Sequence, residues 1–242
     1  HPYQNGARVY YWRSLPDEAE IPYHESIVFQ DEHLVVADKP HFLPVTPGGR
    51  YVQQTLLVRL KKALGLPNLS PLHRIDRETA GLVVFSVRPQ DRDAYQRLFR
   101  ERLIAKTYEA IAPACDHLSW PLTRRSHILE QEDAFYKMRE ALPHEGLGDN
   151  SETTIEVIER RGGWARYRLS PVTGKRHQLR VHMNALGLPL LGDQFYPQVR
   201  RKPGEPEDYA EPLRLLARAM CFDDPVTGEQ RRFESRLELS WP

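Results

Sequence analysis

The sequence predicts an α+β fold, and three observations carry that prediction. Short segments rich in β-branched residues recur along the chain, segments with helical apolar spacing lie among them, and the two kinds do not alternate in a regular strand–helix–strand order. The chain has 242 residues, 40% of them hydrophobic and 28% charged. This balance can fill a core, and the length fits one large domain or two small ones.

Four strands and two amphipathic helices are expected in the first half. Strands are predicted at 27–29, 34–37, 82–87 and 107–112, where apolar and β-branched residues gather. Helices are predicted at 55–64 and 91–102, where leucine and aromatic side chains recur every three or four positions opposite basic ones. Gly65 is expected to end the first helix.

The second half is expected to be richer in hairpins. Residues 114–150 show only a weak pattern. A glycine-containing turn joins predicted strands at 153–159 and 165–169, and a last hairpin pairs 218–222 with 230–239. A helix is predicted at 177–186, ending at Gly187, and a surface loop at 202–211.

Composition excludes several classes of protein. A formal net charge of +1 argues against a protein that coats nucleic acid indiscriminately, but permits a local basic groove. The apolar runs are too short to span a bilayer, so no membrane association is expected. The two cysteines, Cys115 and Cys221, match no metal-binding spacing and favour a reduced, cytoplasmic setting.

The most informative segment surrounds Asp76. This carboxylate lies between Arg74 and Arg77, just before a predicted strand. Cations within about 4–6 Å keep an aspartate ionised, and a second basic segment, 173–180, could supply a deeper partner. The alternative is a surface ion pair of little energetic value.

The second basic segment, 173–180, has two open interpretations. Arg176 and Arg180 are four apart on the predicted helix and would share a face, and Lys175 with Arg176 at the helix N-terminus would suit a phosphate. A solvated basic face is the alternative. Leu169 stands where a Walker loop needs glycine, so a nucleotide-binding loop is not expected. No cysteine or carboxylate lies at metal-binding spacing from His177 and His182, so a metal site is not expected either.

Two further patterns bear on chemistry. No Gly-x-Ser-x-Gly elbow is present, which argues against a serine hydrolase. Several tyrosines fit either base stacking or an ordinary core role: Tyr51, Tyr95, Tyr108 and Tyr136.

Four motifs in order resemble those of the RluA-type pseudouridine synthases. They lie at 29–40, 73–82, 106–108 and 171–182, and the resemblance runs from about residue 27 to 229. It departs at Ala80, where the family more often has serine, at Lys175, where it more often has arginine, and at 215–219, which lacks a common histidine. The resemblance implies a mixed, largely antiparallel central sheet flanked by helices and loops, with a central catalytic cleft.

The resemblance also implies an activity. Such enzymes isomerise uridine in ribosomal or transfer RNA by breaking the N1–C1′ bond, rotating the uracil and rejoining it through C5. Asp76 would attack the sugar or assist elimination to a glycal, and Arg180 would orient Asp76. Tyr108 would stack on the uracil and is a candidate for helping to deprotonate C5. No metal or cofactor is needed, a stem-loop uridine is the expected substrate, and no obligate protein partner is expected.

The base must leave its stack for this chemistry, so residues near Asp76 are expected to bind RNA.

Residues 24–242 would form the catalytic domain and residues 1–23 an N-terminal arm or the remnant of an upstream segment. Two alternatives remain: a non-catalytic RNA-binding or RNA-folding protein on the same scaffold, and a glycoside hydrolase, which needs a second carboxylate that the motif lacks. The expected RNA-binding residues are His73, Arg74, Lys106, Lys175, Arg176, His177 and Leu216.

Overall fold

The computed structural model describes residues 18–132, 134, 136–200, 205 and 208–242. Most of the expected N-terminal arm and half of the loop predicted at 202–211 therefore lie outside the described residues. The described end of the arm packs on the body, because Ile21 is buried and the Glu18 carboxylate accepts hydrogen bonds from the backbone N–H groups of residues 52–54. None of the described helices is long and apolar enough to cross a membrane.

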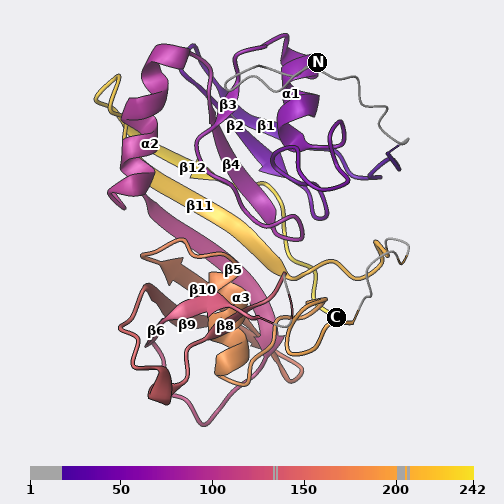
Figure 1. Cartoon of the computed structure of the whole chain (residues 1–242), viewed down its shortest axis with the longest axis vertical. Coiled ribbons are helices and arrows are strands. Elements are labelled where there is room, and N and C mark those ends of the chain that lie inside the picture. The colour runs from indigo at the N-terminus through magenta and orange to yellow at the C-terminus, as the bar shows by residue number, and fades with distance from the viewer. Residues whose placement is uncertain (1–17, 133, 135, 201–204, 206–207) are drawn as a thin grey trace, which may run out of the picture.

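A ten-stranded sheet runs the length of the molecule (Figure 1) in the order β1-β2-β4-β11-β5-β10-β9-β6, with β12 beside β11 and β3 beside β4. Among the pairings of the described strands, only that of β4 with β11 is parallel. The mixed, largely antiparallel sheet is therefore confirmed. The strands are β1 (Ser26–Gln30), β2 (Leu34–Lys39), β3 (Ser70–Pro71), β4 (Ala80–Ser86), β5 (Ala105–Pro113), β6 (Leu122–Ser126), β9 (Ser151–Arg161), β10 (Trp164–Pro171), β11 (Leu215–Asp223) and β12 (Gln230–Glu234).

Strand β11 joins the two halves of the sheet. It follows every other strand but β12 in the chain, yet it lies between β4 and β5. The close contact with β4 depends on Gly81, whose φ is 107° and whose missing Cβ would lie 2.4 Å from the carbonyl oxygen of Ala217. A side chain at this position would collide with the backbone that holds the halves together.

Helices cover both faces of the N-terminal half. Val35 and Val83 pack in one cluster with α1 (Leu56–Leu64), whereas Val36 and Val84 pack in another with α2 (Arg92–Arg100). Neighbouring residues of a strand point to opposite faces, so a strand buried on both sides carries an unbroken apolar run. This arrangement explains the continuous apolar sequence of β4.

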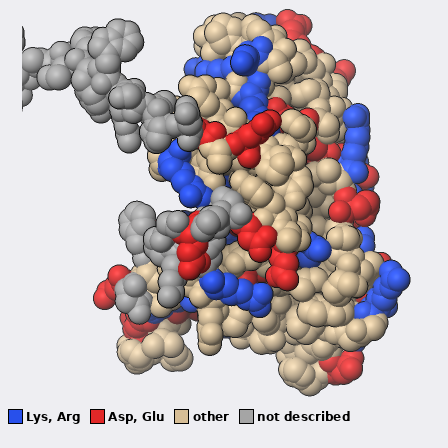
Figure 2. Space-filling model, turned by 90° about the vertical axis from the view of Figure 1, so that its right-hand side faces the viewer, with Lys and Arg blue, Asp and Glu red and all other residues tan. Residues whose placement is uncertain are grey.

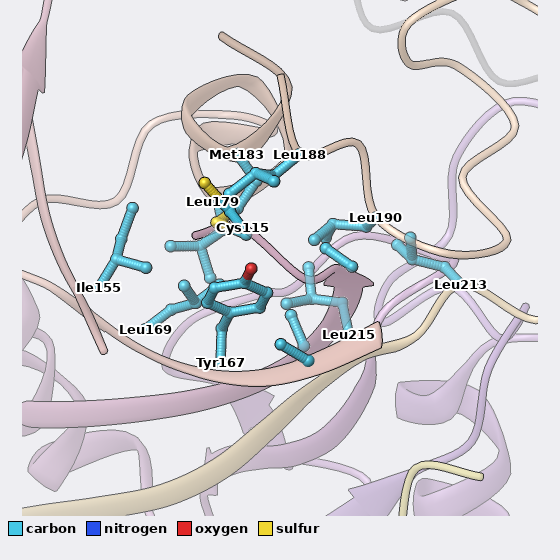
Figure 3. Packing of buried hydrophobic residues seen from close by; sticks show 13 residues of the cluster. Cys115, Ile155, Tyr167, Leu169, Leu179, Met183, Leu188, Leu190, Leu213 and Leu215 are labelled. Atoms are coloured by element: carbon cyan, nitrogen blue, oxygen red, sulfur yellow. The ribbon is translucent and has the colours of Figure 1, made fainter. Parts of the chain in front are cut away.

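The C-terminal half packs α3 (Gln178–Ala185) against the sheet. Figure 3 shows Leu179 and Met183 of this helix above Tyr167 and Leu169 of β10, and all four belong to one buried cluster. The helix thereby sits on the sheet beside the junction of the two halves.

Three sequence-based boundaries were wrong. The weak region 114–150 contains β6 and a separate hairpin, β7 (Ile128–Glu130) with β8 (Met138–Glu140). The strand predicted to reach residue 239 ends at Glu234, because the backbone N–H of Arg236 donates to Asp38 Oδ2 and leaves the ladder. Helix α3 begins at Gln178, since His177 has a φ of 54° and is not helical.

Candidate active site

Asp76 lies in the loop between β3 and β4, and side chains on both flanks hold this loop in place. The Lys39 Nζ donates to the carbonyl of Arg77 at 3.0 Å, and His41 Nδ1 lies 2.8 Å from the carbonyl oxygen of Glu78. Lys39 is fully buried, and burial lowers its pKa to about 7. The conformation of the loop is therefore fixed from the β2 side.

His73 anchors the start of the same loop. Its Nε2 accepts a hydrogen bond from the backbone N–H of Val84 at 3.1 Å, and its ring stacks on Phe99 with centroids 4.7 Å apart. Burial, with nearby Lys106, lowers the pKa of His73 to about 3. His73 is therefore neutral, as its acceptor role requires, and does not serve as a cation.

Arg180 reaches Asp76 from α3, 104 residues away in sequence. Its Nη1 donates to Asp76 Oδ2 at 3.3 Å, while Nε and Nη2 donate to the two carboxylate oxygens of Asp193 at 2.8 and 2.7 Å. The Arg180 side chain is fully buried, whereas that of Asp76 is 25% exposed. Burial works against the charge of Arg180, but the hydrogen bonds and charge of Asp193 raise its pKa.

Asp193 is a functional residue that the sequence analysis missed. Its Oδ1 also accepts hydrogen bonds from the backbone N–H groups of Phe195 and Tyr196 at 2.8 and 3.1 Å. The side chain is fully buried, and its bidentate contact fixes both the position and the plane of the Arg180 guanidinium. The signal available in the sequence was the position of Asp193 shortly after the last motif, which ends at residue 182.

Glu78 is a third carboxylate beside Arg180, and because it lies in the same motif as Asp76, the expectation that this motif lacks a second acid was wrong. Its Oε2 lies 3.7 Å from Arg180 Nη1, and its Oε1 accepts from Arg77 Nε at 3.0 Å. Burial alone would raise the pKa of Glu78, yet Arg180 and Arg77 lower it below the ordinary value. The site therefore keeps its buried charges paired.

Tyr108 of β5 lines the same cavity of about 100 Å³ as Asp76 and Arg180, with Thr79 and Leu215 also in the wall. Burial raises the pKa of Tyr108, and the Asp76 carboxylate raises it further. The phenol therefore stays protonated and uncharged. The three residues expected to carry the chemistry are brought together in one cavity.

His177 lies at the edge of this cavity. Its Nδ1 lies 3.0 Å from the Tyr196 hydroxyl, and its Nε2 lies 4.0 Å from Asp76 Oδ2. Burial lowers the pKa of His177, although Asp76 opposes that shift. The left-handed backbone at His177 turns the ring toward the carboxylate instead of starting the helix.

Two larger recesses open from the cavity. One, of about 410 Å³, we call the cationic lobe; its charged residues are Arg74, Arg102, Lys106 and Lys175. The other, of about 560 Å³, we call the aromatic lobe; its rings are Tyr51, Tyr136 and Phe195. Arg74 and Lys175 line both lobes, so the lobes meet beside Asp76.

Two expectations about the site are corrected. Leu216, expected to contact RNA, is fully buried in a cluster with Ile111 and Leu239, and Leu215 lines the cavity instead. A shift of one residue along a strand moves the side chain to the opposite face. Arg176 precedes α3 and so shares no helical face with Arg180; its Nη2 donates to the carbonyl of Tyr136 at 3.3 Å.

The surface distribution of charge is mixed outside the cleft. Figure 2 shows basic and acidic side chains interspersed over the face it presents. Any strong attraction for a polyanion must therefore arise locally, as in the cationic lobe. In the part of the chain that the structure describes, no group of three or more His, Cys, Asp or Glu residues is arranged to hold a metal ion.

The chain matches known proteins over most of its length. Residues 33–185 match the family model described as RNA pseudouridylate synthase. The dual-specificity RNA pseudouridine synthase RluA of Haemophilus influenzae is 34% identical over 88% of this chain and 93% of that protein. The ribosomal large subunit pseudouridine synthase D of the same organism is 30% identical over 88% of this chain and 67% of its own length.

A solved structure with the same fold also carries the name of this family. The human RNA pseudouridylate synthase domain containing 4 superposes with a TM-score of 0.66 and 27% identity, covering 88% of each chain. The expected fold is therefore confirmed. The chain belongs to the RluA-type RNA pseudouridine synthases, a family of isomerases that act on RNA.

Proposed function

We propose that this cleft converts a stem-loop uridine of ribosomal or transfer RNA into pseudouridine, with Asp76 as the acting carboxylate. The observation that carries this proposal is the contact between Arg180 Nη1 and Asp76 Oδ2, made inside a cavity that Tyr108 also lines. A buried guanidinium, itself fixed by Asp193, donates to the carboxylate and so fixes its position. No metal or cofactor takes part in this proposal.

The reaction breaks the N1–C1′ bond and forms the C5–C1′ bond, while C5 loses its proton and N1 gains one. The hydrogen bond from Arg180 goes to Oδ2 of Asp76, so Oδ1 is the oxygen that we assign to the substrate. Oδ1 either attacks C1′ or removes a sugar proton on the way to a glycal. In both routes Asp76 is the acting carboxylate.

Tyr108 acts as a neutral ring in this proposal. Burial and the Asp76 charge raise the pKa of Tyr108, so a phenolate base at neutral pH is disfavoured. The ring would instead stack on the detached uracil, which must turn before it rejoins the sugar through C5. His177, whose Nε2 lies 4.0 Å from the same Oδ2 atom that accepts from Arg180, would help to hold the carboxylate in place.

The cationic lobe would bind RNA phosphates. In the described part of the chain, none of its four cations forms an ion pair with a carboxylate. Burial lowers the pKa of Lys106, and the neighbouring charge of Arg102 lowers it further. A phosphate would relieve this repulsion, and Arg74 beside Asp76 would fill the space of the flipped nucleotide. Arg102 joins the RNA-binding residues expected from sequence, while His73 contributes a wall of this lobe.

The names of two relatives guide the choice of RNA. One is called dual-specificity and the other a ribosomal large subunit enzyme. We propose that residues 24–242 form the catalytic domain and act in the cytoplasm without an obligate protein partner.

A tritium-release assay tests the proposal. RNA carrying 5-tritiated uridine should release tritium with the natural protein, and Asp76→Asn should abolish release while RNA binding persists. Near-normal release by Asp76→Asn would refute the role of Asp76, and binding without release by the natural protein would refute the activity.

The phosphate contacts have a separate test. Replacing Arg102 and Lys106 together by alanine should reduce the slope of log binding constant against log salt by about 0.7–0.9 for each lost phosphate contact. Lys61 and Lys62, in α1 outside both lobes, provide the matched double-alanine control. An unchanged slope in the Arg102/Lys106 variant would place the RNA backbone elsewhere.

A further inference from the structure

We infer that the aromatic lobe binds the base of a second unstacked nucleotide, next to the target uridine in the RNA. This inference rests on the proposed function of the neighbouring cavity. Its carriers are Phe195 and Tyr136, whose ring centroids lie 5.3 Å apart with planes tilted by 40°. Both side chains are only partly buried and line the aromatic lobe.

His177 connects the aromatic lobe to Asp76. Phe195 stacks on His177 with centroids 5.8 Å apart and planes 18° apart, and His177 Nε2 lies 4.0 Å from Asp76 Oδ2. A base placed on this surface is therefore within a nucleotide's reach of the uridine that Asp76 acts on. Aromatic surfaces of this kind bind unpaired bases with little dependence on sequence.

Phe195 is held rigidly. Its backbone N–H donates to Asp193 Oδ1 at 2.8 Å, and the Arg180 guanidinium carbon lies 5.0 Å from its ring centroid. The carboxylate that fixes Arg180 thus also fixes the ring. A preformed surface of this kind loses little conformational entropy when a base stacks on it.

The size and charge of the lobe also fit a nucleotide. Its volume of about 560 Å³ falls within the roughly 300–1,000 Å³ typical of small-ligand sites. Lys175 and Arg176 line it and supply positive charge for a phosphate. Arg176 also donates to the carbonyl of Tyr136 at 3.3 Å, which ties the Tyr136 backbone to the rim.

Tyr51 has a different role in the lobe. The guanidinium carbons of Arg50 and Arg77 lie 5.0 and 5.5 Å from its ring centroid. Because Phe195 and Tyr136 contact each other, this pair forms the stacking surface, and Tyr51 lines another part of the lobe.

The two lobes together define a path for the strand. Arg74 and Lys175 line both, so an RNA strand passing Asp76 can leave its phosphates against the cationic lobe and place one base in the aromatic lobe. Binding in the aromatic lobe therefore requires that the nucleotide beside the target can leave its stack. This requirement favours single-stranded loops over duplex RNA.

Fluorescence of 2-aminopurine provides the test. Stem-loop RNAs carry this base on the 5′ or the 3′ side of the target uridine, and binding is measured with Asp76→Asn so that no turnover occurs. Stacking in the aromatic lobe should quench one of the two probes. Adding Phe195→Leu or Tyr136→Leu should abolish that quenching and weaken binding about 5- to 150-fold, the equivalent of one base stack.

Phe29→Leu is the matched control. Phe29 is also a partly buried aromatic residue, but it packs on Phe233 outside the cleft. Adding Phe29→Leu to Asp76→Asn should therefore leave both the fluorescence quenching and the binding affinity unchanged. Equal quenching with and without Phe195→Leu, or no quenching at either position, would overturn the inference.

An abasic nucleotide separates this inference from the proposed function. In the turnover assay, an abasic site at the quenched position should raise KM for the natural protein but not further for Phe195→Leu. An abasic site without effect on the natural protein would overturn the subsite while leaving the isomerase assignment intact. No tritium release from any RNA would overturn the proposed function.

Discussion

Asp193 is the residue on which the geometry of the site depends most. The Asp193→Asn variant keeps the size of the side chain but removes its charge and converts one acceptor oxygen into a donor. In the natural protein this carboxylate accepts two hydrogen bonds from Arg180 and two from backbone N–H groups, and both charged side chains are fully buried. The variant would leave a buried guanidinium without its main counter-ion.

The cost can be estimated from general magnitudes. Removing one partner of a buried ion pair costs about 3–5 kcal/mol. For a protein of this length each kcal/mol lowers Tm by about 2–4 °C, so we expect Tm to fall by about 6–20 °C. Turnover should fall about 100-fold or more, because Arg180 no longer positions Asp76 and small displacements are costly in catalysis.

Asp76→Asn is the matched comparison. It makes the same chemical change, but the Asp76 side chain is 25% exposed and accepts a single hydrogen bond of 3.3 Å from Arg180. Its stability should change by less than about 1 kcal/mol, while turnover is lost. Both variants and the natural protein are compared by thermal melting and by the tritium-release assay on the same samples. A residue that holds Arg180 in place should lose stability and turnover together, whereas a residue that acts on the substrate should lose turnover alone.

Two outcomes would contradict this reasoning. If Asp193→Asn has the same Tm and the same turnover as the natural protein, then Asp76 and Glu78 hold Arg180 in place without Asp193. A loss of activity without loss of stability would likewise contradict the estimated cost of the buried pair.

Two further predictions concern the fold. Gly81→Ala should destabilise by at least about 1–3 kcal/mol from backbone strain alone, and more because its Cβ would meet Ala217, as urea unfolding will measure; natural stability would contradict this. Burial lowers the pKa values of His41, His73 and His182 to about 4, 3 and 4. Only the unfolded chain then takes up their protons between pH 6.5 and about 4, so the free energy of unfolding should fall as the pH drops below about 6.5. Equal urea midpoints at pH 7.5 and 5 would contradict this.

Local pattern was a good guide where a segment is buried on one or two faces. The apolar run of β4 and the spacing in α1 predicted both elements, and Thr55 and Gly65 cap α1 as their chemistry favours. The short strands β6 and β7 were missed, because they carry charged residues at or near the sheet edge, where periodicity is weak.

The site was predictable only in part. The order of the motifs pointed to Asp76, Tyr108 and Arg180, and the structure brings them into one cavity. Asp193 escaped notice because nothing in its own neighbourhood marks it as the partner of Arg180. The choice of Leu216 over Leu215 was wrong because only the strand register decides which of two adjacent side chains faces the cleft.

The sequence by itself determined the class of fold, the main buried segments and the family to which the charged motifs belong, since periodicity and motif order are local properties of the chain. The tertiary structure alone decided that β11 lies between β4 and β5, that Asp193 secures Arg180, and that a cationic and an aromatic lobe meet beside Asp76. The reason is physical: these contacts join residues distant in sequence, and their geometry depends on how the whole chain packs.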